Sequence, residues 1–279
     1  PVEERFVISV KTDNAGTSND NQFTIPTRAV GFTYDYNVET SDGQTFSNLT
    51  GNHTITFPSP GTYDIKISGN FPWYRAQYSA DANKLIDVKN WGEIVWGTFS
   101  GAFGGCQNLN VISATDSPDL SSVTSISGMF QNTYYNIQKI NNIENWDVSN
   151  VTSLQGMFSQ SGIIKSPNFP IDLSNWDVSN VTNMGQMFYM AQQPASIIFN
   201  LSNWDISNVT NMTNLFRLGG FSTISNYNAT LISWAAQTPQ NNINVSFGSS
   251  QYTLGGAAET ARNTLINTYG WTITDGGGI

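Results

Sequence analysis

An eight-residue phrase occurs three times in this chain. Asn-Trp-Asp-Val-Ser-Asn-Val-Thr, with one Val-to-Ile change, occupies residues 145–152, 175–182 and 203–210. Each copy leads to a phenylalanine, and the same frame upstream gives the series Phe103, Phe130, Phe158, Phe188 and Phe216, spaced by 27, 28, 30 and 28 residues. A period near 28 residues is typical of a solenoid, in which each coil buries its apolar face only against the next. We therefore predict about five coils of 27–30 residues.

Within one coil, apolar and polar residues are interleaved. Val151, Leu154, Met157 and Phe158 are apolar, and the residues between them are polar or glycine. The Val-x-x-Leu spacing resembles the start of a leucine-rich-repeat strand, whose apolar side chains enter the core while their neighbours face out. Parallel strands lie about 4.8 Å apart, so five coils would present a face roughly 20–25 Å long.

Two further residue types recur once per coil. Tryptophans at 91, 146, 176 and 204 are expected to form a ladder on the side opposite the strands. Asp147, Asp177 and Asp205 begin Asp-Val/Ile-Ser-Asn segments, and Asp, Ser and Asn favour turns because they bond nearby backbone groups. We interpret these carboxylates as caps of the turns; as an alternative, such a row binds cations.

The chain divides into three regions. Residues 1–85 are rich in β-type alternation, with strands predicted at 6–10, 32–36, 54–57 and 63–67 between turn signals. Residues 86–225 form the solenoid. Helical spacing at 227–236 and 257–269, the latter stopped by Gly270, predicts a helical cap over residues 226–279. The fold class is thus an α+β repeat protein: an N-terminal β-sandwich, a leucine-rich-repeat-like solenoid and a helical cap. The segment 71–74 is expected to join the first two regions.

The composition of the chain limits the classes of partner that it can bind. Charged residues make up 11% of the 279, and 11 Lys and Arg face 20 Asp and Glu, for a net charge of −9. This acidic balance argues against nucleic acid and anionic membrane surfaces as partners. No apolar run approaches the ~18 residues of a membrane span. The sequence begins at Pro1 without an initiator Met or signal peptide, so we expect a monomeric fragment of a larger protein.

Few residues could support catalysis. His53 is the only histidine, which excludes a metal site built on several imidazoles. A Ser-His-Asp or Cys-His catalytic arrangement would have to use this one residue, which lies in a polar turn. Cys106, the single cysteine, cannot form an internal disulfide and suits a small buried position. Paired carboxylates, as in glycosidases, stay open. We predict that the protein is not an enzyme, has no catalytic residues and requires no cofactor.

Calcium is the one cofactor that the sequence leaves open. Asp13, Asn19 and Asp20 lie in an oxygen-rich loop, and calcium prefers oxygen ligands. The spacing does not match an EF-hand, and Asn/Asp loops also form plain turns.

The whole chain resembles the BspA-like leucine-rich-repeat surface proteins of bacteria. The motifs that carry the resemblance are Asn-Trp-Asp-Val-Ser-Asn-Val-Thr-Asn-Met-x-x-Met-Phe at 175–188 with its copies, the ending at 264–277 and the opening at 11–26. The resemblance implies a PKD-like β-sandwich before the solenoid and an extracellular, cell-surface adhesion module that contacts a host or a neighbouring cell. Residues 39–43, Glu-Thr-Ser-Asp-Gly, lack the Trp and first Gly of the usual PKD-like turn.

Leucine-rich repeats generally bind through outward side chains of their strands. Here these form two rows, which we call the strand face: Thr98, Ser125, Ser153, Asn183 and Asn211, then Ser100, Ser127, Gln155, Gly185 and Thr213. Their short uncharged groups suit peptide backbone or sugar hydroxyls. Loop residues Tyr134, Tyr135, Tyr189 and Arg217 interrupt the repeat, and Tyr and Arg are favoured at interface hot spots.

We expect a protein or peptide ligand on this surface, with a carbohydrate ligand or a purely structural spacer as alternatives. The rows could instead simply solvate the sheet, and the loop aromatics could pack on the next coil.

Overall fold

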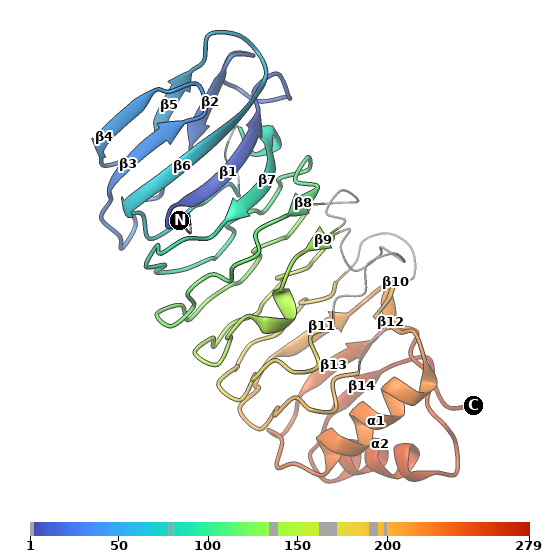
Figure 1. Ribbon diagram of the computed structural model, residues 1–279. Helices are drawn as coiled ribbons and strands as arrows, with labels where there is room; N and C mark the ends of the chain where they lie inside the picture. Colours follow the sequence, from blue (N-terminus) through green and yellow to red (C-terminus); the bar gives the residue numbers. More distant parts are fainter. Residues whose placement is uncertain are drawn as a thin grey trace.

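Most of the regular secondary structure described is β-strand, and the chain runs from antiparallel sheets at one end to two helices at the other (Figure 1). The computed structural model describes residues 3–77, 79, 81–133, 139–161, 172–189, 195–197 and 200–279. The sheets are mixed, with antiparallel strands at the N-terminal end and parallel ones beyond it. Among the described residues, no helix has the length and apolar character needed to cross a membrane.

The N-terminal region contains two sheets that share one core. A seven-stranded sheet has the order β4-β3-β6-β1-β7-β8-β9. Its strands are β1 (Phe6–Lys11), β3 (Asp35–Thr40), β4 (Thr45–Leu49), β6 (Thr62–Asn70), β7 (Leu85–Asn90), β8 (Val111–Ile112) and β9 (Lys139–Ile140). A separate antiparallel pair, β2 (Gln22–Ile25) and β5 (His53–Thr56), adds Phe23 and Ile55 to the same core. The predicted strands at 6–10, 54–57 and 63–67 coincide with β1, β5 and β6, whereas the one predicted at 32–36 begins at Asp35.

The repeat frame is visible as a stack of phenylalanine rings. Ring centroids of successive members are 5.7, 5.9, 6.0 and 5.0 Å apart, and the interplanar angles never exceed 15°, along the series Phe103, Phe130, Phe158, Phe188 and Phe216. All five are at most 1% exposed. Near-parallel rings at this spacing lie directly over one another, so the phenylalanines of the predicted frame form one stack.

The repeats are joined by a series of backbone hydrogen bonds, but only single residues form β-bridges, instead of the extended strands that the sequence suggested. Parallel bridges join Ser125 to Ser153, Ser153 to Asn183 and Asn183 to Asn211. Three residues after the bridging residue, Gly128 and Gly156 have φ of +61°. A left-handed backbone favours glycine. Only the last of these segments, β11 (Met212–Phe216), is a strand.

The polar residues of the repeated phrase connect neighbouring repeats. The Trp176 indole donates to the Ile143 carbonyl, and that of Trp204 to Leu173, both at 2.9 Å. Asn180 donates to the Ser149 carbonyl at 2.7 Å, and Asn208 does the same one repeat later. The two indole bonds satisfy carbonyls of buried residues, whereas the two asparagine bonds are exposed. Of the four predicted tryptophans, Trp176 and Trp204 thus bond the repeat before them, whereas the buried indole N–H groups of Trp91 and Trp146 have no hydrogen-bond partner in the described structure.

The aspartates of the phrase cap their own turns. Asp147, Asp177 and Asp205 accept from the backbone N–H of Ser149, Ser179 and Ser207 at 2.9–3.1 Å. Asp119 makes the same bond to Ser121 at 2.9 Å, one repeat earlier. This geometry matches the capping role expected from the sequence.

Both α-helices belong to further turns of the same stack. The elements here are β10 (Ala195–Ile197), β12 (Gly219–Phe221), α1 (Ile224–Ala235), β13 (Asn244–Phe247), α2 (Ala257–Asn267) and β14 (Thr272–Thr274), with short 3₁₀ turns at Ala82–Lys84 and Ile143–Asn145 elsewhere. β11, β13 and β14 form a parallel sheet, and α1 packs on α2 (Figure 1). Trp234 and Trp271 continue the indole ladder, bonding the carbonyls of Leu201 and Gln240. The stack thus extends past residue 225, where the sequence placed the last coil.

The predicted stop of the second helix is confirmed. Gly270 has φ of +69°, and its N–H bonds the Ile266 carbonyl while that of Trp271 bonds Leu265. The bond from Gly270 to a carbonyl four residues back is that of the αL motif, which uses glycine for its left-handed residue.

The N-terminal sheets and the repeats are joined by continuous structure. β7 pairs antiparallel with β1 and parallel with β8, so one sheet crosses the junction. The Trp73 indole donates to the Ser100 carbonyl at 2.9 Å. A β-carbon on Gly101 would lie 2.3 Å from the Gln77 amide oxygen, so glycine makes room for that side chain. The segment 71–74 therefore lies between the two regions, as expected.

Candidate functional site

The strand face has the alignment that the sequence predicted. Its first row contains the bridging residues themselves, Ser125, Ser153, Asn183 and Asn211, and Thr98 bonds the Ser125 carbonyl at 3.1 Å. The second row is joined to the repeat before it through backbone carbonyls, for example from Gly128 N–H to Gln155 at 2.8 Å and from Gly156 N–H to Gly185 at 2.9 Å. Both rows are therefore held in fixed register by the backbone.

Many side chains of the strand face bond one another. Ser125 donates to Ser127 at 3.1 Å, and the Ser127 and Ser153 hydroxyls lie 2.7 Å apart. Further along, Asn183 donates to the Gln155 amide oxygen at 3.2 Å and Asn211 to the Asn183 amide oxygen at 3.0 Å. These bonds orient the side chains in advance. They also occupy some of the donors and acceptors that could otherwise bond a ligand.

A third row, of threonines, lies beside these two and was missed from the sequence. Thr152, Thr182 and Thr210 are exposed and donate their hydroxyls to the carbonyls of Thr124, Thr152 and Thr182 at 3.0–3.2 Å. The signal was available, because every copy of the repeated phrase ends in Val-Thr. We assigned the whole repeated phrase to the turn, whereas its last residue, the threonine, already lies on the exposed face beside the two rows.

The loop residues divide into two groups. Tyr134 and Tyr135 lie outside the described residues. Arg217 stacks over the ring of Tyr189 at 5.7 Å and donates to its hydroxyl at 3.3 Å, one repeat apart. Arg217 is exposed and Tyr189 is half-buried. This pair therefore offers a cation and a ring edge near the end of the repeats.

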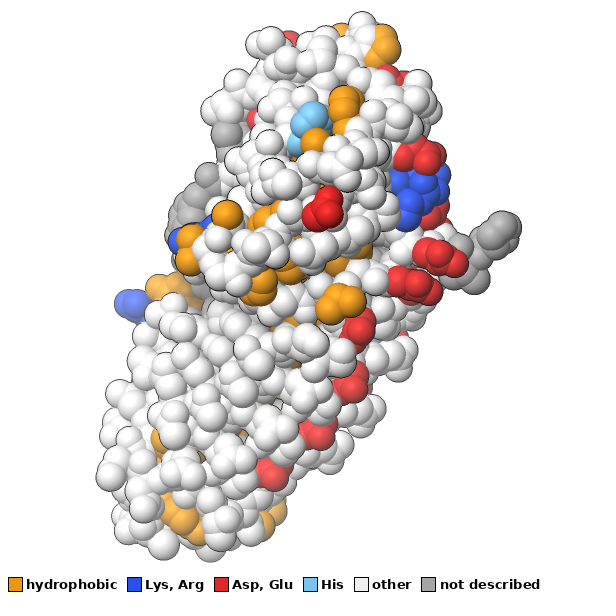
Figure 2. Space-filling model, turned by 90° about the vertical axis from the view of Figure 1, so that its left-hand side faces the viewer, with side chains coloured by type: hydrophobic (Ala, Val, Ile, Leu, Met, Phe, Trp, Pro, Cys, Tyr) orange, Lys and Arg blue, Asp and Glu red, His pale blue; other side chains and the backbone are white. Residues whose placement is uncertain are grey.

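The surface around the rows is almost uncharged. Figure 2 shows a broad area over the repeats without charged side chains, bordered by a line of acidic ones. Asp119, Asp147, Asp177 and Asp205 occur once per repeat and are all exposed. Hydrogen bonds from Ser121 and Ser179 lower the pKa of Asp119 and Asp177, so these carboxylates are charged at neutral pH. The cation-binding alternative for this line stays a prediction.

Comparison with known proteins identifies one segment of the chain. Residues 97–234 match the model of a family described as "Mycoplasma protein of unknown function, DUF285". These residues form a DUF285 domain. No curated protein and no solved structure matches the chain.

The DUF285 domain includes the phenylalanine stack, all of the strand face and all but the last residue of α1. Its first residues, 97–103, are those on which Trp73 and Gln77 pack. It ends at Trp234, so β13, α2 and β14 lie beyond it although they continue the stack. The region before it contains His53 and the loop with Asp13, Asn19 and Asp20.

The residues considered for catalysis occupy structural positions. Cys106 is fully buried in the DUF285 domain, and burial raises the pKa of its thiol, which disfavours the reactive thiolate. His53 packs its ring 4.5 Å from Phe46 in the N-terminal region, and burial lowers its pKa. Within the described ranges, no three His, Cys, Asp or Glu side chains are grouped so that they could hold a metal ion.

The loop proposed for calcium surrounds an internal cation. The ammonium of Lys84, a fully buried residue, donates to the carbonyls of Ser18, Asn19 and Gln22 at 2.8–3.1 Å and to the Ser18 hydroxyl at 2.8 Å. Asp13 is paired with Lys11, and Asp20 is exposed. Carbonyl oxygens of this loop thus already coordinate a positive charge. Calcium at Asp13, Asn19 and Asp20 stays a prediction.

Replacing Lys84 with methionine is expected to lower the free energy of unfolding by about 2–3 kcal/mol. The change keeps the chain length but removes bonds from a charged donor to four acceptors, and water can reach those partly exposed groups. Urea denaturation would measure the loss. Lys89→Met, at a surface Lys–Asp pair, is the matched control and should cost under about 1 kcal/mol. Equal stability of the two variants would contradict the role given to Lys84.

Proposed function

We propose that this protein is a non-catalytic binding module of a bacterial surface adhesin. In this proposal the repeats are a leucine-rich-repeat-like solenoid of the BspA type, preceded by a PKD-like β-sandwich. The module works outside the cell and holds a protein or peptide ligand on the strand face. The stacked repeats and the motif resemblance support this assignment.

The observation that carries the proposal is that recurring and variable residues of each repeat have different roles. The residues that repeat are used within the fold: the indoles and asparagines bond neighbouring repeats and the aspartates cap turns. The positions that differ between repeats face outward, as Gln155 and Thr213 do in the second row. A surface that is regular in backbone and variable in side chains suits recognition of a particular partner.

The chemistry of this surface favours a polar, uncharged contact. Hydroxyl and amide groups both donate and accept, so they can match the N–H and C=O groups of an extended peptide. Because the face carries almost no charge, binding there removes few ions from water, which is the costly step at charged interfaces. The cores of protein interfaces are likewise depleted of charged residues.

The test is a capture experiment with the isolated chain. The protein is offered to immobilised peptides, glycans and whole cells, with and without calcium. We expect capture by a peptide or protein, and we expect Gln155→Arg and Thr213→Arg to weaken it at least 10-fold because each places a bulky charge on the strand face. Both side chains are exposed, so thermal unfolding should shift little.

The control is Thr45→Arg, on the edge strand β4 at the other end of the molecule. It adds the same charge to an exposed threonine and should leave capture unchanged. Glycan capture alone would favour a carbohydrate-binding module, and no capture on any surface would favour a spacer. Equal loss with all three variants would contradict the site on the strand face.

A further inference from the structure

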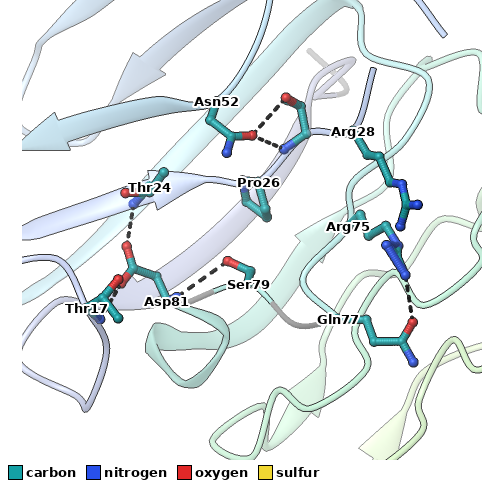
Figure 3. Close-up of a pocket in the computed structure, with 10 residues that line it drawn as sticks. Thr17, Thr24, Pro26, Arg28, Asn52, Arg75, Gln77, Ser79 and Asp81 are labelled. Atoms are coloured by element: carbon teal, nitrogen blue, oxygen red, sulfur yellow. Dashed lines mark hydrogen bonds between the residues drawn. The ribbon is translucent and has the colours of Figure 1, made fainter. Parts of the chain in front are cut away.

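A polar pocket lies where the N-terminal sheets meet the segment leading into the repeats. Its volume is about 430 Å³, within the range of about 300–1,000 Å³ of small-ligand sites. Ten residues line it: Thr17, Thr24, Pro26, Thr27, Arg28, Asn52, Arg75, Gln77, Ser79 and Asp81 (Figure 3). It is separate from the strand face, so an assignment here does not depend on the proposed function.

Two arginines share one aromatic ring at this pocket. The Arg75 guanidinium lies 5.1 Å from the centroid of Trp73, and that of Arg28 lies 5.7 Å from it. Figure 3 shows both guanidinium groups on the same side of the pocket. Arginine is scarce in this acidic chain, where Lys and Arg together number 11. Two like charges held close together favour an anion between or beside them.

Hydrogen bonds hold the backbone of Arg28 and the guanidinium of Arg75. The buried Tyr34 hydroxyl accepts from the Arg28 N–H at 3.0 Å and donates toward the carbonyls of Arg28 at 3.1 Å and Trp73 at 2.9 Å. Arg75 donates to the Gln77 amide oxygen at 3.0 Å, and Gln77 donates in turn to Gln131 at 3.0 Å. The cation pair is therefore built by bonds from both sides of the junction.

The carboxylate in the lining does not neutralise this pair. Asp81 accepts from the backbone N–H groups of Thr17 and Ser18 at 3.1 Å and of Thr24 at 2.9 Å. Burial raises the pKa of Asp81, but the bonds from Ser18 and Thr24 lower it further, so the group is anionic. Its oxygens are directed at these amides. In the described parts of the chain, no carboxylate forms a salt bridge with Arg28.

The rest of the lining consists mainly of hydroxyl and amide groups. The Asn52 amide oxygen accepts from the N–H and the hydroxyl of Thr27 at 2.7 and 2.9 Å. This orientation leaves the Asn52 NH₂ group as a donor, and no described residue accepts from it. Thr17 and Ser79 add hydroxyls. Such groups bond ligand hydroxyls, while planar guanidiniums pair with carboxylates through two parallel bonds.

We propose that this pocket binds an acidic sugar, with the carboxylate on Arg28 and Arg75 and the sugar hydroxyls on Asn52, Thr17 and Ser79. The two guanidiniums supply the charge for one carboxylate. A phosphate, which carries nearly two negative charges, would call for further basic groups, and the lining has none beyond this pair. Pro26 offers a small apolar surface to the C–H side of a sugar ring.

The experiment follows binding at the pocket itself. Sodium glucuronate and N-acetylneuraminate are titrated separately into the full chain, and the ¹⁵N-labelled indole N–H signal of Trp73, assigned with a Trp73→Phe variant, is observed by NMR. Glucose tests whether the carboxylate is needed, and inorganic phosphate tests whether any anion suffices. We expect a saturable shift with one or both acidic sugars and none with glucose. The two acidic sugars differ in how the carboxylate is attached, so their ranking identifies the preferred type.

Two variants test the assignment to the arginines. Arg28→Gln removes an exposed guanidinium and should weaken binding of the acidic sugar at least 10-fold without lowering the melting temperature. Arg75→Gln should do the same, and its melting temperature is recorded because Arg75 also contacts Gln77. Lys89→Gln, which removes the same charge elsewhere, should have no effect. Equal binding of glucose, binding of phosphate but not of acidic sugars, or unchanged affinity of Arg28→Gln would each overturn the proposal.

Discussion

Replacing Phe158 with alanine is expected to lower the free energy of unfolding by about 3–5 kcal/mol, the cost of emptying a large buried site. Phe158 is fully buried in the middle of the phenylalanine stack. Its ring lies 5.9 Å from Phe130 and 6.0 Å from Phe188, so its loss removes contacts with two repeats at once. In a stacked repeat protein, stability depends on contacts between nearest neighbours. Urea denaturation followed by circular dichroism would measure the change.

Phe158→Leu is the matched variant, because it keeps an apolar side chain in the stack and should cost clearly less than alanine. A serine exposed in a turn, Ser122, provides a surface control whose change to alanine should stay within about 0.5 kcal/mol. If Phe158→Ala cost no more than Ser122→Ala, the rings would not be what holds the repeats together. A loss confined to the neighbouring repeats would show as a broadened, multistep transition.

The repeat frame could be predicted because its signal is large and redundant. Phenylalanines one per repeat, a recurring tryptophan and recurring aspartates all gave the same period, and the structure stacks them in that order. The end of the frame was harder to find. The tryptophans persist as Trp234 in α1 and Trp271 after α2, but the rest of the phrase is absent. Helical spacing there hid the fact that β13 and β14 continue the parallel stack.

Extended strands in the repeats were overestimated for a local reason. Val-x-x-Leu spacing indicates a strand, yet Gly128 and Gly156 adopt a left-handed backbone three residues after the bridging residue. The predicted alignment of the strand-face residues between repeats was still correct, because it depends only on the repeat period. In the N-terminal region, β2, β4 and β7 were missed because their side chains do not form apolar alternations long enough to stand out.

The pocket at the junction could not be found in the sequence. Arg28 and Arg75 are 47 positions apart, and nothing near either of them resembles a motif. Only the folded chain brings both to the Trp73 ring. Similarly, Lys84 and the loop around Ser18 meet across 66 residues. Long-range polar contacts of this kind depend on tertiary structure. The repeats, in contrast, can be recognised because the same residue types recur at a fixed spacing along the chain.

Asp275→Asn should be about as damaging as the loss of Phe158, with a cost of about 3–5 kcal/mol. Asp275, whose side chain is 3% exposed, accepts from the Arg262 guanidinium at 2.8 and 3.2 Å and from the Tyr227 hydroxyl at 2.8 Å. This network links α2 to α1 and to the end of the chain after β14. The substitution leaves a mostly buried guanidinium without its counter-charge, and breaking a buried pair on one side is strongly destabilising.

Tyr227→Phe separates the charge from the hydrogen bond. Burial and the Asp275 carboxylate raise the pKa of Tyr227, so its hydroxyl stays protonated and serves as a neutral donor. Its removal should therefore cost only about 1 kcal/mol. The double variant Arg262→Met with Asp275→Asn leaves no unpaired charge, so it should recover part of the stability lost by Asp275→Asn alone. The recovery should be partial, because Arg262 also stacks over Tyr252 at 5.2 Å. Strictly additive losses in this double-mutant cycle would mean that the ion pair does not couple α2 to the end of the stack.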